Sequence, residues 1–319
     1  MNILIIRHKG LGHLDLKEEH LLKIKEVKPG IEITVAQDAA EAAPHLPQAE
    51  VMVGVFHLLP PIKEAVNLKW VHGLGAGADG LEPAIVNSPI LVSNSSGVAA
   101  IPIAEHILAF LLIFTKKLYI TFANQRRKNW ERQSLTELRG KTILIVGLGH
   151  IGKESARLLS CMGAKVLAID QAGKEKPDFV ETLKTKEEFN ELLPLADFVV
   201  ICVPLTKETH HLFGREKFKQ MKPTAVLVNI GRGAIVKEKE LIDALEKKVI
   251  AGAALDVQEI EPLPQDSPLW GMENVIITPH HSPSSEKYMD RAINLFCENL
   301  KAYLKGERLP NLIDKERGY

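Results

Sequence analysis

Short apolar runs alternate with polar, helix-like stretches along almost the whole chain. In the first third, the runs cover residues 2–6, 31–35, 51–55, 70–71 and 90–92. In the second half, they cover residues 142–146, 165–169, 198–202, 225–229, 251–256 and 275–277. Nearly continuous apolar runs of this length are typical of strands buried on both faces, and their alternation with helices favours parallel sheets. The pattern predicts an α/β fold built from two doubly wound parallel sheets.

A chain of 319 residues is longer than one hydrophobic core usually accommodates, so two domains are expected. The clearest break is the polar segment 94–97, which precedes a long helix that Pro102 is expected to begin. A second long helix is expected from residue 285 to about residue 304, and the tail 309–314 can return to the first domain. We predict a discontinuous first domain, residues 1–97 and 284–319, with a second domain, residues 98–283, inserted into it.

A glycine-rich segment follows the strand expected at residues 142–146. Its sequence at 147–152 is GLGHIG, and Asp170 ends the next apolar run, eighteen residues after Gly152. The glycines permit a tight turn, and the N-terminus of a helix over about 151–162 favours a pyrophosphate. A carboxylate about 20 residues further along binds a ribose 2′-hydroxyl and repels a 2′-phosphate. The spacing favours NAD over NADP, although the fingerprint by itself also fits a methyltransferase or a flavin site.

Two further segments match this fingerprint less completely. Residues 75–80, GAGADG, follow an apolar stretch, but too few residues precede Pro83 for a crossover helix, and no acidic residue ends the next run. We interpret this segment as a turn with another function. Residues 10–15 lack the last glycine and are interpreted as a loop after the first strand.

Polar residues that follow the second-half strands are the candidates for chemistry, because ligands gather at the carboxyl ends of parallel strands. Arg232 lies between two glycines, Glu261 lies in a proline-stiffened loop, and His280 follows the last strand. The arginine fork matches the carboxylate and carbonyl of a 2-oxo acid. A histidine, with an ordinary pKa near ~6.5, can donate the proton that accompanies hydride transfer, and a neighbouring carboxylate orients its ring. These residues together predict carbonyl reduction.

Each of these residues also has a purely structural explanation. Taken singly, such an arginine is more often a surface ion-pair residue, such a histidine a loop residue and a Glu-Pro pair a turn. Their joint occurrence at consecutive strand ends favours the catalytic interpretation. Three other histidines compete with His280, namely His281, His210 and His211, of which the last two are expected to begin a helix.

Charge and cysteine content narrow the class of protein. Forty basic and forty acidic residues cancel, so neither nucleic acid nor a membrane surface is an expected partner. Cys161, Cys202 and Cys297 have apolar neighbours and no metal-ligand spacing, which predicts reduced core residues, no metal site and a cytoplasmic protein. The N-terminal residues are expected to form a strand rather than a cleavable signal. The longest apolar run, residues 107–114, is far shorter than the ~20 residues that span a bilayer.

The order and spacing of several motifs give the chain a strong resemblance to the D-isomer-specific 2-hydroxyacid dehydrogenases. The motifs are residues 147–152, 203–206 (VPLT), 229–233 (NIGRG), 254–257 (ALDV) with 261–264 (EPLP), and 278–280 (TPH). The resemblance extends from about residue 41 to the C-terminus, whose ending is most like that of the glyoxylate/hydroxypyruvate reductase branch. It implies a Rossmann domain that binds NAD, inserted into a flavodoxin-like substrate domain.

The resemblance also implies roles for individual residues. Arg232, Glu261 and His280 match the family's catalytic residues, which favours His280 over His281. The positions that match cofactor contacts are Gly147, Gly149, His150, Ile151, Gly152, Asp170, Pro204, Ile230, Gly231 and Asp256. The positions that match a loop whose backbone amides bind the substrate carboxylate are Gly75, Ala76 and Gly77. Departures from the family pattern at Gln258 and at residues 281–283 leave the substrate open.

The combined expectation is an NAD-dependent oxidoreductase that interconverts a small 2-oxo acid and its D-2-hydroxy acid, with His280 as the acid/base. Family members are usually dimers built around the helix that begins near Pro102, so a homodimer is expected. Two alternatives stay open. One is a non-catalytic NAD(H)-sensing binding protein, because the family includes transcriptional corepressors, and the other is a dehydrogenase of another small anion such as phosphite or formate.

Overall fold

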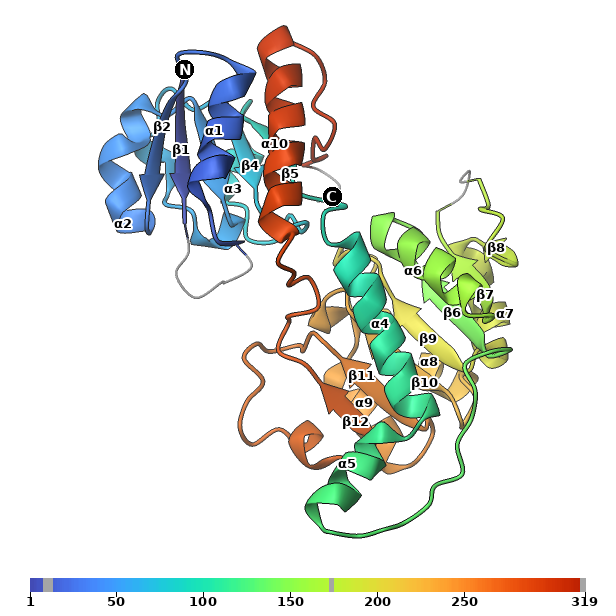
Figure 1. The fold of residues 1–319 in the computed structure, drawn as a ribbon. Coiled ribbons are helices and arrows are strands. Elements are labelled where there is room, and N and C mark those ends of the chain that lie inside the picture. The colour runs from blue at the N-terminus through green and yellow to red at the C-terminus, as the bar shows by residue number, and fades with distance from the viewer. Residues whose placement is uncertain (8–13, 172–174, 316–319) are drawn as a thin grey trace. The chain divides into compact units, whose positions relative to one another are not determined.

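The computed structural model describes residues 1–7, 14–171 and 175–315, and the chain divides into two compact units. One unit comprises Met1–Ala99 and Ser284–Tyr319, and the other comprises Ala100–Pro283 (Figure 1). The sequence placed the boundaries after residues 97 and 283. Most of the loop expected at residues 10–15 lies outside the described residues.

The first unit is built on five parallel strands in the order β2-β1-β3-β4-β5. The strands are β1 (Asn2–Ile6), β2 (Glu32–Ala36), β3 (Val51–Gly54), β4 (Trp70–Gly73) and β5 (Leu91–Asn94). The α-helices are α1 (Glu18–Val27), α2 (Ala39–Ala42), α3 (Pro83–Val86) and α10 (Tyr288–Lys305), with 3₁₀ turns at Ala43–Gln48, Phe56–Leu58 and Ile62–Glu64. This strand order is the one found in flavodoxin-like sheets.

The second unit is built on seven parallel strands in the order β12-β11-β10-β9-β6-β7-β8. The strands are β6 (Thr142–Val146), β7 (Lys165–Ile169), β8 (Thr182–Lys184), β9 (Phe198–Ile201), β10 (Val226–Asn229), β11 (Gly252–Leu255) and β12 (Val275–Ile277). The α-helices are α4 (Ala100–Thr115), α5 (Leu118–Arg126), α6 (His150–Cys161), α7 (Phe189–Leu192), α8 (Arg215–Gln220) and α9 (Glu238–Glu246). The 3₁₀ turns are Lys186–Glu188, Leu193–Leu195, Gly233–Ile235 and Pro268–Gly271. The strand order reverses between β6 and β9, which is the ligand-binding crevice of a doubly wound sheet.

A separate hydrophobic core supports each sheet. The core of the second unit includes Leu144, Val199 and Leu227 from its central strands. The C-terminal tail completes the core of the first unit, because Ile313 is buried there and its N–H donates to the carbonyl of Val92 (2.8 Å). The close-packed cores therefore fix the positions of the strand ends in each unit.

Several local expectations differ from the structure. Strand β8 was not predicted, because its residues are only partly buried and form no apolar run. Cys161 is exposed at the end of α6, so the expectation of a core residue was wrong there. His210 and His211 do not begin a helix: they lie in a turn, His211 has a left-handed φ of 53°, and α8 begins only at Arg215. The helix expected from Pro102 begins at Ala100.

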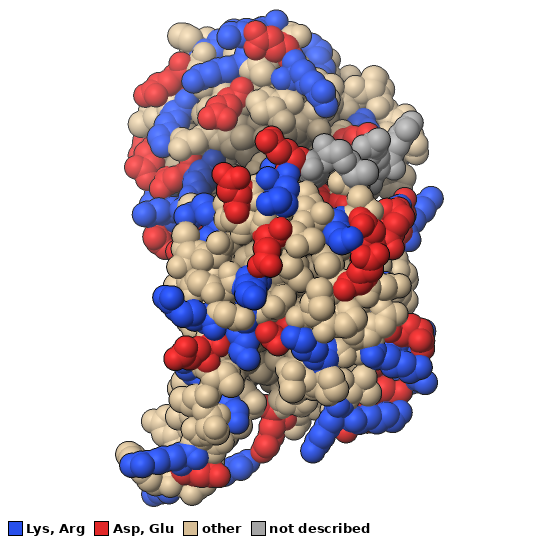
Figure 2. Space-filling view, turned by 90° about the vertical axis from the view of Figure 1, so that its right-hand side faces the viewer, with Lys and Arg blue, Asp and Glu red and all other residues tan. Residues whose placement is uncertain are grey.

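Two whole-chain properties bear on the expected partners. Within the described residues, no single helix is long and apolar enough to cross a membrane, and only α4 and α5 taken together, with a 67° bend between them, meet the same test. Lys and Arg side chains are interspersed with Asp and Glu over the face seen in Figure 2. This distribution accords with the equal numbers of basic and acidic residues.

Candidate functional site

The glycine-rich segment forms the turn between β6 and α6. Gly147 has a φ of 100°, a conformation that L side chains rarely adopt. A Cβ on Gly152 would overlap the carbonyl oxygen of Gly147, whereas a Cβ on Gly149 would meet no atom within 4 Å. A tight turn, close packing at the last glycine and open space at the middle one are what a pyrophosphate at a helix N-terminus requires. These residues therefore fit a dinucleotide.

Asp170 lies beside this turn, directly after β7. Its Oδ2 accepts a hydrogen bond from the N–H of Leu148 (2.7 Å), and its Oδ1 accepts one from the N–H of Gln171 (2.6 Å). These bonds hold the carboxylate next to the glycine turn. This is the position expected from the sequence for a carboxylate that binds the ribose. A carboxylate in this place suits a free 2′-hydroxyl better than a 2′-phosphate.

Arg232 follows β10 in a turn that the side chain of Asn229 organises. Asn229 is almost fully buried, its Oδ1 accepts from the N–H of Gly231 (3.1 Å), and its Nδ2 donates to the carbonyl of Arg232 (3.0 Å). The Arg232 guanidinium donates to the carbonyl of Gly231 (2.8 Å). The sequence analysis did not single out this role of Asn229, although an asparagine two residues before a glycine in a turn is a signal for such side-chain bonding to the backbone.

Gly233 brings the arginine turn against the loop that carries Glu261. A Cβ on Gly233 would overlap the carbonyl group of Gln258, so the two backbones touch only because residue 233 is glycine. Within the loop, the N–H of Gln258 donates to Oε1 of Glu261 (3.0 Å), and Nε2 of Gln258 donates to the carbonyl of Leu255 (3.2 Å). These bonds hold the Glu261 carboxylate at the carboxyl end of β11.

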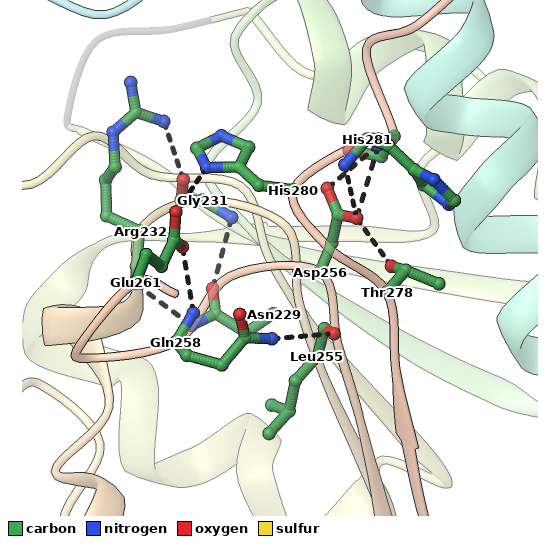
Figure 3. Close-up of polar contacts among 11 residues, drawn as sticks. Asn229, Gly231, Arg232, Leu255, Asp256, Gln258, Glu261, Thr278, His280 and His281 are labelled. Carbon is green, nitrogen blue, oxygen red and sulfur yellow. Dashed lines mark hydrogen bonds and ion pairs between the residues drawn. The ribbon is translucent and has the colours of Figure 1, made fainter. Parts of the chain in front are cut away.

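His280 and Glu261 form a hydrogen-bonded ion pair and point toward one another (Figure 3). The His280 Nδ1 atom lies 2.8 Å from the Glu261 Oε2 atom. His280 has a φ of 50°, and its N–H donates to the carbonyl of Asp256 (2.8 Å). Burial opposes ionisation of Glu261, but the hydrogen bond and charge of His280, with help from Arg232, keep the pKa of this carboxyl below its usual value. Because Nδ1 bonds the carboxylate, Nε2 is the ring nitrogen left for proton transfer.

Asp256 is fully buried at the end of β11 and ties down the segment that follows β12. Its Oδ1 accepts from the hydroxyl of Thr278 (2.5 Å) and from the N–H of His281 (3.1 Å), and its Oδ2 accepts from the N–H of Ser282 (3.0 Å). These bonds bracket His280 on both sides in the sequence. The carboxylate therefore shapes the turn that presents His280.

His106, from α4, joins the same cluster. Its Nε2 lies 3.1 Å from the Thr278 hydroxyl, and because that hydroxyl donates its proton to Asp256, the imidazole must be the donor. Burial lowers the pKa of His106, which outweighs the opposite effect of Asp256. Ligand atoms of His106, Asp256 and His281 lie within 4.8 Å of one another, a spacing that a metal ion also fits. The Asp256 oxygens, however, already accept the hydrogen bonds described above.

The other predicted positions lie around the same strand ends. Those at the start of α6 and after β9 and β10 are His150, Ile151, Pro204 and Ile230. The competing histidines have other partners: the ring of His281 packs edge-on against His106, and His211 Nε2 lies 2.6 Å from Glu259 Oε1. Among the histidines of the described residues, only His280 pairs with Glu261.

The predicted substrate loop, Gly75, Ala76 and Gly77, belongs to the first unit and follows β4. It forms a bend in which these three residues are partly or fully exposed. Within the part of the chain that the structure describes, none of their three N–H groups has a hydrogen-bond acceptor. Unpaired backbone N–H groups in succession are suited to bind an anion.

The glycine turn and the acid–histidine pair at the strand ends are features that a nucleotide-dependent dehydrogenase requires. Residues 108–282 match the family described as D-isomer specific 2-hydroxyacid dehydrogenase, NAD binding domain. This match covers more than half of the chain. The chain belongs to the D-isomer specific 2-hydroxyacid dehydrogenases, and its second unit contains the NAD-binding domain of that family, which confirms the expectation from the sequence.

Similar proteins agree with this assignment. A glyoxylate reductase from Thermofilum pendens is 40% identical over 262 residues, which cover 79% of this chain and 76% of the relative. A solved family member from Aeromonas salmonicida subsp. salmonicida has a TM-score of 0.86 and 30% identity, covering 98% of this chain and 99% of that one. The NADPH-dependent glyoxylate/hydroxypyruvate reductase of Sinorhizobium meliloti, solved with NADP and sulfate, has a TM-score of 0.84 and 26% identity over 100% of both chains. The predicted α/β fold with two parallel sheets is thereby confirmed.

Proposed function

We propose that this protein is an NAD-dependent D-2-hydroxyacid dehydrogenase that interconverts a small 2-oxo acid, of the glyoxylate or hydroxypyruvate kind, and its D-2-hydroxy acid. The observation that carries the proposal is the His280–Glu261 pair, 2.8 Å apart at the carboxyl ends of strands whose glycine turn fits a dinucleotide. The names of the T. pendens and S. meliloti relatives support the substrate class.

Each candidate catalytic residue has one task in this reaction. Arg232 binds the substrate carboxylate and polarises the neighbouring carbonyl with its planar fork. During reduction, His280 gives the proton on Nε2 to the carbonyl oxygen, and during oxidation it takes that proton back. Glu261 holds Nδ1 and stabilises the charged ring. A bound nicotinamide supplies the hydride that adds to the carbonyl carbon.

The substrate carboxylate also binds to the first unit in this proposal. The N–H groups of Gly75, Ala76 and Gly77 have no acceptor among the described residues, so they can donate to a carboxylate without breaking an existing bond. Charge-assisted bonds of this kind are about twice as strong as neutral ones. The loop would then contribute to the recognition of the acid group.

We infer a preference for NAD from Asp170. Its carboxylate, bonded to the N–H of Leu148 at 2.7 Å, would accept the 2′-hydroxyl and repel a 2′-phosphate. The S. meliloti relative was solved with NADP. Measuring the activity of this protein with both NADH and NADPH therefore tests the preference directly. Asp170→Ala should raise the ratio of kcat/KM with NADPH to that with NADH by about tenfold, the equivalent of ~1.4 kcal/mol. A wild-type protein that prefers NADPH would refute the inference.

A panel of 2-oxo acids tests the proposed reaction. Glyoxylate, hydroxypyruvate and pyruvate are each incubated with NADH and with NADPH, and nucleotide oxidation is followed by absorbance. We expect turnover of at least one acid with NADH. Arg232→Ala should lower kcat/KM by about three orders of magnitude while NADH binding, measured by fluorescence titration, stays near that of the wild type.

Arg215→Ala is the matched control, because Arg215 is an exposed arginine at the start of α8 that pairs with Asp243. This variant should keep the wild-type kinetics. If the protein binds NADH but does not oxidise it in the presence of any of the 2-oxo acids, it is an NAD(H)-sensing protein. Oxidation of phosphite or formate with NAD would identify a dehydrogenase of another anion.

We also propose that the protein is a cytoplasmic homodimer. In the second unit, three large apolar side chains from one stretch of the chain, those of Phe122, Trp130 and Leu135, are 52%, 94% and 52% exposed, and exposed apolar surface is what a dimer interface would cover. The three cysteines are free thiols, as expected in a reducing compartment. Light scattering should give the mass of two chains for the wild type and of one chain for Trp130→Glu. A monomeric wild type would contradict the dimer, and cell fractionation checks the location.

A further inference from the structure

The predicted substrate loop, residues 75–77 after β4, is anchored by hydrogen bonds from Ser95, which follows β5. The Ser95 hydroxyl donates to the carbonyl of Gly73 (3.0 Å), and the Ser95 N–H donates to the carbonyl of Gly75 (3.0 Å). One residue thus grips the loop on both sides of Leu74. Ser95 is itself fully buried, so these bonds do not compete with water.

Two further residues complete the same clamp. The hydroxyl of Tyr288, at the start of α10, donates to the carbonyl of Leu74 (2.7 Å). The Nδ2 atom of Asn94 donates to the carbonyl of Ala76 (2.6 Å). Four successive carbonyls, from residue 73 to residue 76, therefore each accept a hydrogen bond. These four carbonyls are therefore held away from a bound anion, while the N–H groups of residues 75–77 have no acceptor within the described chain.

The hydrogen bonds behind Ser95 run in one direction. Trp70 Nε1 donates to the Ser93 hydroxyl (2.8 Å), which lies 2.7 Å from Nδ1 of His72. Because the Ser95 hydroxyl beside Nε2 of His72 donates to a carbonyl, Nδ1 accepts the Ser93 proton, and the imidazole carries its own proton on Nε2. That proton points to the Ser95 hydroxyl at 3.3 Å, whose proton goes in turn to Gly73. A buried chain in which every donor has one acceptor fixes the orientation of its last member.

We propose that Asn94, Ser95 and Tyr288 are positioning residues for substrate binding. By holding the carbonyls of residues 73–76, they present the N–H groups of residues 75–77 as a preformed site for the carboxylate of the 2-oxo acid. None of the three touches the reacting atoms, and they act through the loop. The inference rests on the proposed function, because it takes this loop as the carboxylate site.

Tyr288→Phe tests the clamp by removing one hydroxyl from a buried ring. We expect KM for the preferred 2-oxo acid to rise about tenfold, kcat to change less than about threefold and NADH binding to stay unchanged. Hydrogen exchange of the Ser95 N–H should become faster, because its acceptor, the Gly75 carbonyl, lies in a loop that has lost the anchor at Leu74. This exchange measurement does not depend on turnover.

Tyr303→Phe is the matched control. Tyr303 lies on the same helix, and its hydroxyl donates to Glu50 Oε1 (3.0 Å) rather than to the loop. This variant should leave both KM and the Ser95 exchange unchanged. An equal rise of KM in both variants would show that the effect is a general loss of stability and would overturn the proposal.

Asn94→Ala decides the question if Tyr288→Phe does not fold, because the Ala76 carbonyl that it frees is at an exposed position. We expect the same rise of KM at nearly constant kcat. An unchanged KM in a folded variant would overturn the clamp while leaving the proposed function intact. Absence of any turnover in the wild type would instead refute the proposed function, and slower or unchanged Ser95 exchange in Tyr288→Phe would then refute the clamp on its own.

Discussion

Gly233 and Gln258 touch backbone to backbone, with no space for a side chain between them. This contact joins the turn of Arg232 to the loop of Glu261. We predict that Gly233→Ala separates the two, because the overlap is with a carbonyl group that no side-chain rotation relieves. The free energy of unfolding should fall by about 1–3 kcal/mol, and kcat/KM should fall at least about tenfold. Thermal unfolding and steady-state kinetics measure both.

Gly271→Ala provides the control for this prediction. A Cβ on Gly271 would meet no atom within 4 Å, and the residue does not have a positive φ. We expect its stability and activity to match those of the wild type. If Gly233→Ala were equally neutral, the contact would not position the site.

The glycines of the β6–α6 turn should respond differently to the same substitution. A methyl group at Gly152 would overlap the carbonyl oxygen of Gly147, so Gly152→Ala should lower the melting temperature. Gly149 has open space, so Gly149→Ala should fold normally but weaken NADH binding by about tenfold or more, because the methyl group would occupy the path of the pyrophosphate. Calorimetric binding and melting curves separate the two effects. Unchanged NADH affinity in Gly149→Ala would argue against a pyrophosphate there.

The His280–Glu261 pair predicts a pH effect. The pKa of Glu261 lies below its usual value, so the carboxylate stays ionised throughout the neutral range and favours the protonated imidazole. In Glu261→Gln, this support is lost, so the pH above which the reduction rate declines should move to a lower value. The profile of kcat/KM against pH measures the shift. The reverse direction, or no shift with a normal rate, would contradict the assigned role.

His72 predicts how the stability of the first unit depends on pH. Burial lowers the pKa of His72 to about 3 from 6.5, so the unfolded chain binds more protons than the folded chain between these values. The free energy of unfolding should therefore fall as the pH drops below 6.5, by up to ~1.4 kcal/mol per pH unit from this residue. His72→Gln should reduce this slope, and the exposed His45 gives the control His45→Gln.

Fluorescence makes that measurement specific to the first unit. The chain has three tryptophans, and only Trp70 lies in that unit. Replacing Trp130 and Trp270 by Phe leaves Trp70 as the reporter during denaturant unfolding at several pH values. Equal slopes in the wild type and in His72→Gln would show that burial of this imidazole does not govern acid stability.

The sequence was most informative where one physical signal dominated. Strands such as β6 and β9 are continuous apolar runs because both faces are buried, and their positions could be predicted from this pattern. β8 gives no such signal, because its three residues at the end of the sheet are only partly buried. Cys161 was misjudged for a related reason, since an apolar neighbourhood in the sequence does not tell which face of α6 a residue occupies.

The residues of the candidate site were predictable as types, but their contacts were not. Arg232, Glu261 and His280 were found because each follows a strand. The bonds of Asn229 and Thr278 depend on how the ends of β10, β11 and β12 approach one another, which a linear pattern does not encode. Nor does the sequence signal a left-handed φ of 50° at a histidine.

The clamp behind residues 73–76 has a consequence for selectivity among substrates. A loop that folding has already ordered loses little conformational entropy when an anion binds, so it offers nearly the same binding free energy to any small carboxylate. Such a loop cannot tell glyoxylate from its longer relatives. Selectivity among 2-oxo acids must then come from side chains that contact the part of the substrate beyond its carboxylate. Changing the preferred acid should therefore require no alteration of the loop.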